Sequence, residues 1–203
     1  MAVVKTLTFS EESKGWTSFW SYEPKYCFSL AGEYFSLNDA KLHKHYDIES
    51  SQSTFYGVYY DSSVTIVINE APSIPKNFKT VNYEGTNGWQ VSSIESDSFR
   101  PSSNEYGNVA SFDSAVSIPS YSEGKYIDGG VAYRAGFDRK ENKYYANIKS
   151  GVVIPREGEV LLTDKTAGIK GVFATIKIET DETPDLGGVK QLFAVSSEYV
   201  QSA

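Results

Sequence analysis

Val172-Phe173-Ala174-Thr175-Ile176-Lys177-Ile178 is the stretch of sequence that decides the fold class. Apolar residues recur at every second position from Val172 to Ile178. Because alternate side chains of a β-strand point to the same face of a sheet, this spacing predicts a strand with one buried face.

Similar short segments recur along the chain. Residues 15–22 are rich in aromatic and hydroxyl side chains, which suit a half-buried strand. Residues 26–30 and 33–36 flank a turn at Ala31-Gly32, and residues 54–60 and 64–68 are expected to pair as a hairpin across Asp61-Ser62-Ser63.

Helix signals are weak by comparison. The best candidate, residues 36–45, is interrupted by the turn signal Asn38-Asp39 and is equally well explained by a turn and a strand. About a dozen short strands with regular turns are typical of a sandwich, a barrel or part of a propeller. The sequence therefore predicts an all-β, antiparallel β-sandwich or barrel-like module with short connections and one long loop.

The long loop is expected at residues 96–125, where Ser, Pro, Gly and Asn dominate. A loop of that length is usually functional or ordered by a partner, and the alternative is a meander of short strands. We expect a β-rich half at residues 1–95, the loop at 96–125 and a second β-rich half at 126–203. Since the chain has 203 residues, one compact domain overall is expected.

Charge and composition exclude several classes of function. The net charge is −7, and scattered lysines at positions 41, 44, 76 and 79 are interpreted as a solvated face, so no sequence-specific nucleic acid partner is expected. No apolar segment approaches the roughly 18 residues of a membrane span or the length found in a signal peptide. We therefore expect that the chain does not insert into a membrane and that it assembles in a cytoplasm. Cys27 is the single cysteine, and its aromatic neighbours predict a buried thiol.

His43, His45 and Asp47 form the one constellation with metal-binding character. On a strand they would share a face, and two imidazoles with a carboxylate suit a divalent cation. The favoured interpretation is a solvent-facing polar face with Leu42 directed inward.

Acidic pairs offer a hydrolase hypothesis, because glycoside hydrolysis needs two carboxylates across a cleft. Glu11-Glu12 and residues 179–182 are the candidates, although acidic loops are mostly solvating. Phosphate-binding and serine-nucleophile motifs are absent from the sequence. We therefore assign no catalytic, cofactor-binding or metal-binding residue and no cofactor.

Aromatic residues make up 14% of the chain, and because leucine and methionine are few, aromatic side chains must also fill the core. They are interpreted mainly as core and subunit-interface residues, with a sugar-stacking platform as the alternative. The candidates for that platform are Trp16, Phe19, Trp20, Tyr22, Tyr56, Tyr59, Tyr60 and Trp89.

Three stretches resemble a known family: Gly15-Trp16-Thr17-Ser18-Phe19, residues 36–46 and Phe55-Tyr56-Gly57-Val58. They are similar to a recurrent pattern in muzzle- or nozzle-type tail proteins of tailed bacteriophages, which are usually longer and carry this region near their C-terminus. Residues 76–85 continue the pattern, and residues 191–200 resemble the closing strand of such proteins.

The resemblance implies a non-enzymatic structural protein of the virion, in the tail, the neck or a tail-associated ring. It also implies a homo-oligomer in contact with other virion proteins. Two alternatives remain open at this point: a glycan-binding adhesin module of a receptor-binding apparatus, and a polysaccharide or peptidoglycan hydrolase.

Overall fold

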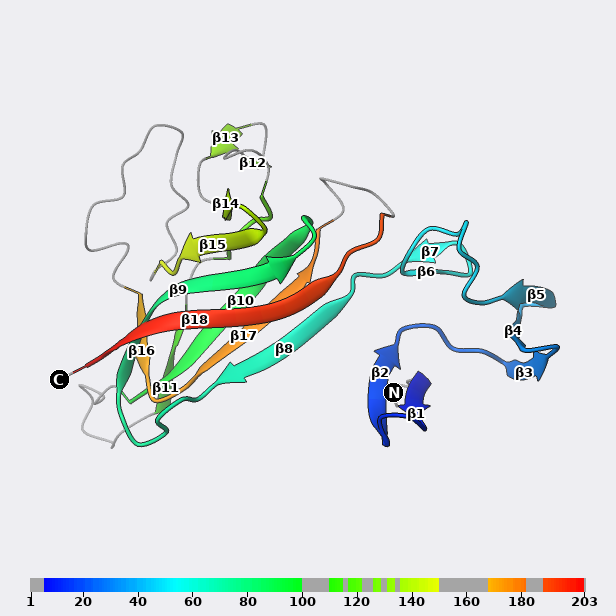
Figure 1. Cartoon of the computed structure of the whole chain (residues 1–203), viewed down its shortest axis with the longest axis horizontal. Coiled ribbons are helices and arrows are strands. Elements are labelled where there is room, and N and C mark those ends of the chain that lie inside the picture. Colours follow the sequence, from blue (N-terminus) through cyan, green and yellow to red (C-terminus); the bar gives the residue numbers. More distant parts are fainter. Residues whose placement is uncertain are drawn as a thin grey trace. The chain divides into compact units, whose positions relative to one another are not determined.

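The computed structural model describes residues 6–99, 110–114, 117–121, 126–128, 131–133, 136–149, 168–181 and 188–202. Every helix or strand assigned in these residues is a β-strand, which confirms the all-β prediction (Figure 1). The chain divides into two compact units, Met1–Tyr60 and Asp61–Ala203. We call them the smaller and the larger unit.

Short antiparallel ladders build the smaller unit. Its strands are β1 (Thr6–Ser10) paired with β2 (Gly15–Trp20), the three-stranded sheet β3 (Tyr26–Leu30), β4 (Glu33–Asn38) and β5 (Lys41–Lys44), and β6 (Thr54–Phe55) paired with β7 (Val58–Tyr59).

Tight turns explain why these strands form. Ala31 and Gly32 both have positive φ angles, 52° and 82°, and so reverse the chain between β3 and β4 as predicted. Asp39 and Ala40, at 47° and 61°, do the same between β4 and β5. The helix candidate at residues 36–45 is therefore strand, turn and strand.

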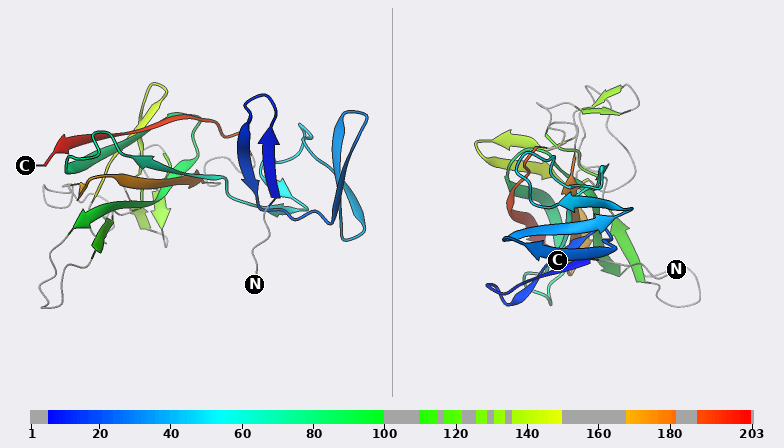
Figure 2. Two further views of the ribbon diagram at one scale, coloured as in Figure 1. Left: turned by 90° about the horizontal axis from the view of Figure 1, so that it is seen from below. Right: turned by 90° about the vertical axis from the view of Figure 1, so that its right-hand side faces the viewer.

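Two sheets lie face to face in the larger unit (Figure 2). One has the strand order β11 (Ala110–Ser114), β10 (Trp89–Phe99), β17 (Ala174–Thr180) and β8 (Ser63–Ile68). The other has the order β14 (Asp138–Lys140), β15 (Lys143–Asn147), β9 (Lys76–Gly85) and β16 (Ile169–Gly171), with β18 (Leu192–Gln201) also paired to β9. A separate hairpin joins β12 (Tyr126–Asp128) to β13 (Val131–Tyr133).

The core of the larger unit fills the space between these sheets. Ala174, Ile176 and Ile178 of β17 are fully buried at alternate positions, which confirms the predicted one-sided strand. Phe78 and Val81 of β9 lie in the same buried cluster, so the two sheets share one core. This arrangement is a β-sandwich, one of the architectures that the spacing of strands and turns predicted.

The predicted hairpin between residues 54–60 and 64–68 is wrong. β6 and β7 pair with each other, because Tyr56 and Gly57 have positive φ angles of 54° and 82° and form a tight turn. β8 pairs instead with β17, and Ile66 lies opposite Ile176. The partner of β8 is distant in sequence, and local turn chemistry carries no information about it.

The predicted exposure of Lys76 is also wrong: this residue was expected on a solvated face, but it is fully buried. Its ammonium donates hydrogen bonds to the carbonyl oxygens of Ala71 and Ile74, at 3.0 and 3.1 Å. The Nζ atom also lies 5.6 Å from the centre of the Tyr199 ring. These contacts compensate the ammonium for the water it loses on burial.

Two parts of residues 96–125 join the sandwich. β11 pairs with β10, and Ile118 bridges Val91 through backbone hydrogen bonds of 2.8 and 2.9 Å. Much of the rest of this segment lies outside the described residues. The division of the chain at 96–125 therefore stays a prediction.

Replacing Ile176 by Ala tests the shared core. The substitution leaves a cavity between the sheets, so we expect the free energy of unfolding of the larger unit to fall by about 2–5 kcal/mol in urea titrations. Val67→Ala on β8 is the control, because Val67 is largely exposed and should change stability little. Equal effects of the two substitutions would contradict the sandwich.

Candidate functional site

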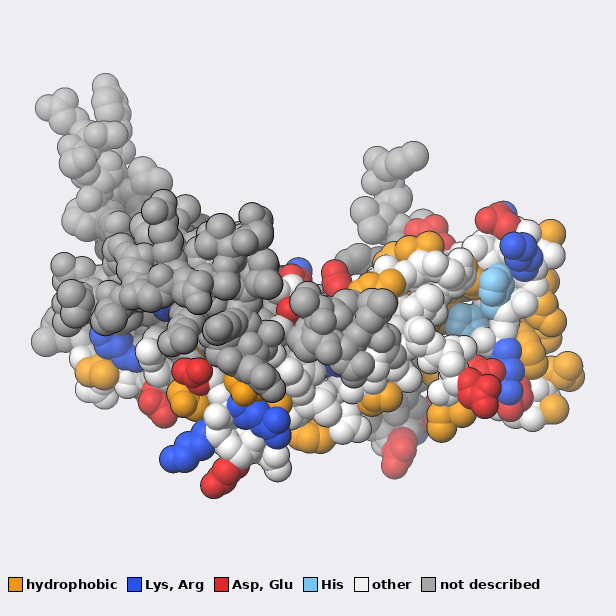
Figure 3. Space-filling model, turned by 90° about the horizontal axis from the view of Figure 1, so that it is seen from above, with side chains coloured by type: hydrophobic (Ala, Val, Ile, Leu, Met, Phe, Trp, Pro, Cys, Tyr) orange, Lys and Arg blue, Asp and Glu red, His pale blue; other side chains and the backbone are white. Residues whose placement is uncertain are grey.

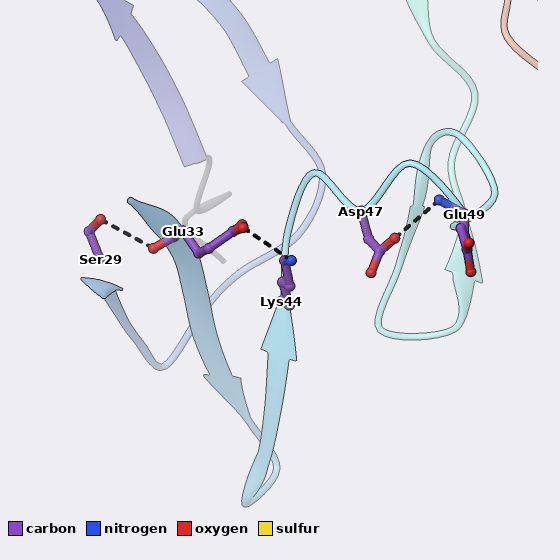
Figure 4. Close-up of polar contacts among 5 residues, drawn as sticks. All are labelled: Ser29, Glu33, Lys44, Asp47 and Glu49. Carbon is purple, nitrogen blue, oxygen red and sulfur yellow. Dashed lines mark hydrogen bonds and ion pairs between the residues drawn. The ribbon is translucent and has the colours of Figure 1, made fainter. Parts of the chain in front are cut away.

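His43, His45 and Asp47, the alternative metal ligands, do not share the face of one strand. β5 ends at Lys44, so the alternation that would place His43, His45 and Asp47 on one face stops before His45. Asp47 instead accepts a hydrogen bond from the backbone NH of Glu49, at 3.1 Å (Figure 4). Within the described ranges no three His, Cys, Asp or Glu side chains are grouped as metal ligands.

His45 points into the smaller unit rather than to solvent. Its side chain is 9% exposed, and its Nε2 lies 2.6 Å from the hydroxyl oxygen of Ser36, which is fully buried. The same hydroxyl lies 2.8 Å from the phenol oxygen of Tyr56. The expected solvent-facing histidine pair with Leu42 inward is therefore wrong, because Leu42 is exposed.

Aromatic rings enclose this Ser36–His45–Tyr56 network. The Tyr22 ring stacks on Phe55 at 4.6 Å between centroids, and it lies 5.0 Å from the His45 ring. Tyr34 contacts His45 from another side, at 4.8 Å. A serine hydroxyl beside an imidazole can act as a nucleophile, but Ser36 has no exposed surface for a substrate to reach. The network instead satisfies polar groups inside an aromatic core.

Burial lowers the pKa of His45 below its ordinary value of 6.5, and the nearby His43 lowers it further. The folded unit therefore favours the neutral form of the His45 imidazole. Burial likewise raises the pKa of Tyr22, which keeps its phenol protonated.

Acidification tests this assignment. A histidine with a lowered pKa contributes its full share of stability above pH 6.5, where it is neutral in both states. As the pH falls below 6.5, the unfolded chain binds the proton more readily, so we expect the smaller unit to lose stability. Urea titrations followed by tryptophan fluorescence measure this loss, and Trp16 and Trp20 report on the unit.

His45→Gln should flatten the pH dependence between pH 6.5 and 5, whereas His43→Gln is the matched control and should retain it. A wild-type unfolding midpoint that does not change with pH in this range would contradict the buried neutral histidine.

Three of the acidic candidates have polar partners within their own unit. Glu11 forms an exposed ion pair with Lys14 at 3.6 Å. Glu179 pairs with Lys177 at 2.6 Å, and Asp181 accepts a hydrogen bond from Ser120. Glu182 lies outside the described residues.

The aromatic candidates for a sugar platform divide into groups. Trp20, Tyr22 and Tyr56 belong to the aromatic core just described. Trp89 is buried in the core of the larger unit and donates its indole NH to the carbonyl oxygen of Gln191, at 3.2 Å. Trp16 and Phe19 are exposed on the β1–β2 hairpin. The eight residues therefore do not form one stacking surface.

The hairpin of β1 and β2 has an apolar outer face. Leu7 lies opposite Phe19 and Phe9 opposite Trp16 in the ladder, and the Phe9 and Trp16 rings meet edge to face at 5.4 Å. These four side chains, which we call the hairpin face, are 45–71% exposed. The other side of the hairpin carries Trp20, which donates to the Thr8 hydroxyl at 2.6 Å.

The sheet of β3, β4 and β5 is two-sided in the same way. Tyr34, Ser36 and His43 lie on the side of the aromatic core. The opposite side, which we call the sheet face, carries the side chains in register with Tyr26 and Phe28. The sheet face consists of Tyr26, Phe28, Leu30, Phe35, Leu37 and Leu42. Four of these side chains are 37–62% exposed: Tyr26, Leu30, Leu37 and Leu42.

An ion pair closes one end of the sheet face. Glu33 and Lys44 lie 3.2 Å apart, and Ser29 donates to the Glu33 carbonyl oxygen at 3.2 Å (Figure 4). At the other end Lys25 pairs with Asp39 at 2.5 Å. Figure 3 shows hydrophobic side chains gathered over this sheet.

Cys27 was expected to be a buried thiol, but it is exposed. Side chains along β3 alternate between its two faces, so Cys27 lies on the opposite face from Tyr26 and Phe28. One buried face could therefore not contain all three. The sequence signal for the sheet face was present in the period of two from Tyr26 to Leu30. The missing information was which face of the strand the rest of the chain covers.

Comparison with known families adds an independent observation. Residues 50–150 match the family model of the Crassvirus muzzle protein C-terminal domain. The resemblance to muzzle-type proteins of phages is confirmed. The match covers about half of the chain and includes β8, β9, β10 and β15 of the sandwich.

A muzzle-type domain indicates a structural component of a phage particle and therefore a virion protein. A search of curated proteins gives no match. The described part of the chain contains no membrane-spanning helix.

Proposed function

We propose that this chain is a non-enzymatic subunit of the phage tail, neck or a tail-associated ring, and that it acts through protein–protein assembly. It forms homo-oligomers and contacts other virion proteins, and it joins the particle in the host cytoplasm. Sequence-specific nucleic acid and membrane insertion play no part in this function.

The main observation that supports this proposal is the distribution of apolar side chains in the smaller unit. Among its described residues, Tyr22 is the one buried hydrophobic side chain. Many large hydrophobic side chains of the same unit are exposed to water: Leu7, Phe9, Trp16, Phe19, Tyr26, Leu30, Leu37, Leu42, Tyr46, Ile48 and Val58. Exposed apolar surface of this density is typical of an interaction site.

The larger unit supports the same proposal through its long edge strand. β18 extends from Leu192 to Gln201, and in the described residues β9 is its one partner. An edge strand of this length without proline offers backbone hydrogen-bonding groups to another chain. Phe193 and Val200, which are exposed, flank that edge with apolar surface.

Mass spectrometry of purified phage particles tests the proposed function. We expect the polypeptide to co-purify with the particles at a constant copy number relative to the major tail proteins, because a symmetric assembly fixes its stoichiometry. A non-structural protein of the same phage controls for carry-over. Particles that are complete and infectious without this chain would contradict the proposal.

A further inference from the structure

We propose that copies of this chain associate head to tail, with the hairpin face of one copy packed on the sheet face of the next. The inference rests on the proposed assembly function and assigns the surfaces that carry it. The two faces lie on different strands of the smaller unit, and each is exposed while its opposite side is occupied by the aromatic core.

The areas of the two faces suit one interface. Large apolar side chains present roughly 150–250 Å² each, so the exposed fractions correspond to about 500 Å² on each face. Packing one face on the other would remove about 1,000 Å² from water, which is the approximate lower limit for a specific interface. Each face is about as large as the largest apolar patch of a typical monomer, and patches of that size are often functional.

The charges around the two faces are complementary. Residues 6–20 carry Glu11, Glu12 and Lys14, so two negative charges and one positive charge leave the hairpin at −1. Residues 25–44 carry three lysines (25, 41 and 44) against Glu33 and Asp39, which leaves the sheet at +1. A chain with a net charge of −7 repels its copies, so this local difference favours contact between unlike faces.

Contact between like faces fits these observations less well. Pairing two hairpin faces would bring two negative hairpins together, and it would leave both sheet faces in water. A head-to-tail contact covers both faces of every copy. Repetition of such a contact produces a closed ring or an open array, depending on the rotation between neighbours.

Complementation between two variants of the full chain tests the inference. Trp16→Ser/Phe19→Ser removes the hairpin face and leaves the sheet face, whereas Leu30→Ser/Leu42→Ser does the reverse. In analytical ultracentrifugation we expect wild-type chain to form oligomers and each variant alone to be monomeric. An equimolar mixture should form heterodimers and no larger species, because one intact hairpin face then meets one intact sheet face.

Ile48→Ser is the matched control, since Ile48 is 94% exposed and lies on neither face. It should retain the wild-type oligomers. Circular dichroism of every variant checks that the strands remain. If either double variant unfolds, variants that exchange charges between the two faces test the contact instead. Glu12→Lys or Lys41→Glu alone should weaken association roughly two- to fivefold. Both substitutions on one chain should restore association.

Three results would overturn the inference: a monomeric wild-type chain, oligomers of either variant alone, or a mixture without heterodimers. A monomeric chain that is nevertheless present in purified particles would reject this contact and leave the proposed function standing. A head-to-tail oligomer that is absent from particles would reject the proposed function and leave the contact standing.

Discussion

Removal of apolar side chains from water is the constraint on which the rest of this structure depends. The larger unit meets it internally, because β9 and β17 direct alternate apolar residues into one core. The smaller unit does not, because its strands are short and direct many of their large apolar side chains outward. A short hairpin and a three-stranded sheet enclose too little volume for a core of ordinary size. The same physical effect therefore stabilises a fold in one unit and creates an interaction surface in the other.

The polar network of Ser36, His45 and Tyr56 determines which side of the smaller unit's sheet faces inward. A buried hydroxyl and a neutral imidazole satisfy each other at 2.6 Å, and the surrounding rings exclude water. Since side chains alternate along β4, burying Ser36 places Phe35 and Leu37 on the opposite side. The exposed apolar face is thus a direct geometric consequence of the buried polar one. A serine–histidine pair that suggests catalysis in isolation has an organising role here.

Features that depend on neighbouring residues were predicted from the sequence, whereas features that depend on distant residues were not. The period of two in β17 and the turn at Ala31-Gly32 depend on neighbouring residues, and the structure confirms both. The partner of β8 depends on residues more than a hundred positions away, and the predicted hairpin was wrong. Lys76 was misplaced for a related reason, because the Tyr199 ring near its ammonium belongs to β18, more than a hundred positions away, and the two meet only when β9 and β18 pair. For the candidate site, the sequence singled out His45 but expected it on a solvent-facing strand, whereas it is buried.

The sequence by itself determined that the chain is all-β, where many of its strands lie, and that it resembles muzzle-type phage proteins. These conclusions follow from spacing and composition, which each segment carries locally. Only the tertiary structure decided which strands pair, which histidine is buried, and which face of each sheet is exposed. Period-two alternation divides a strand into two faces without stating which one the rest of the chain covers. That choice depends on contacts between distant segments, and it converts the aromatic residues of the first sixty positions into both a core and a surface.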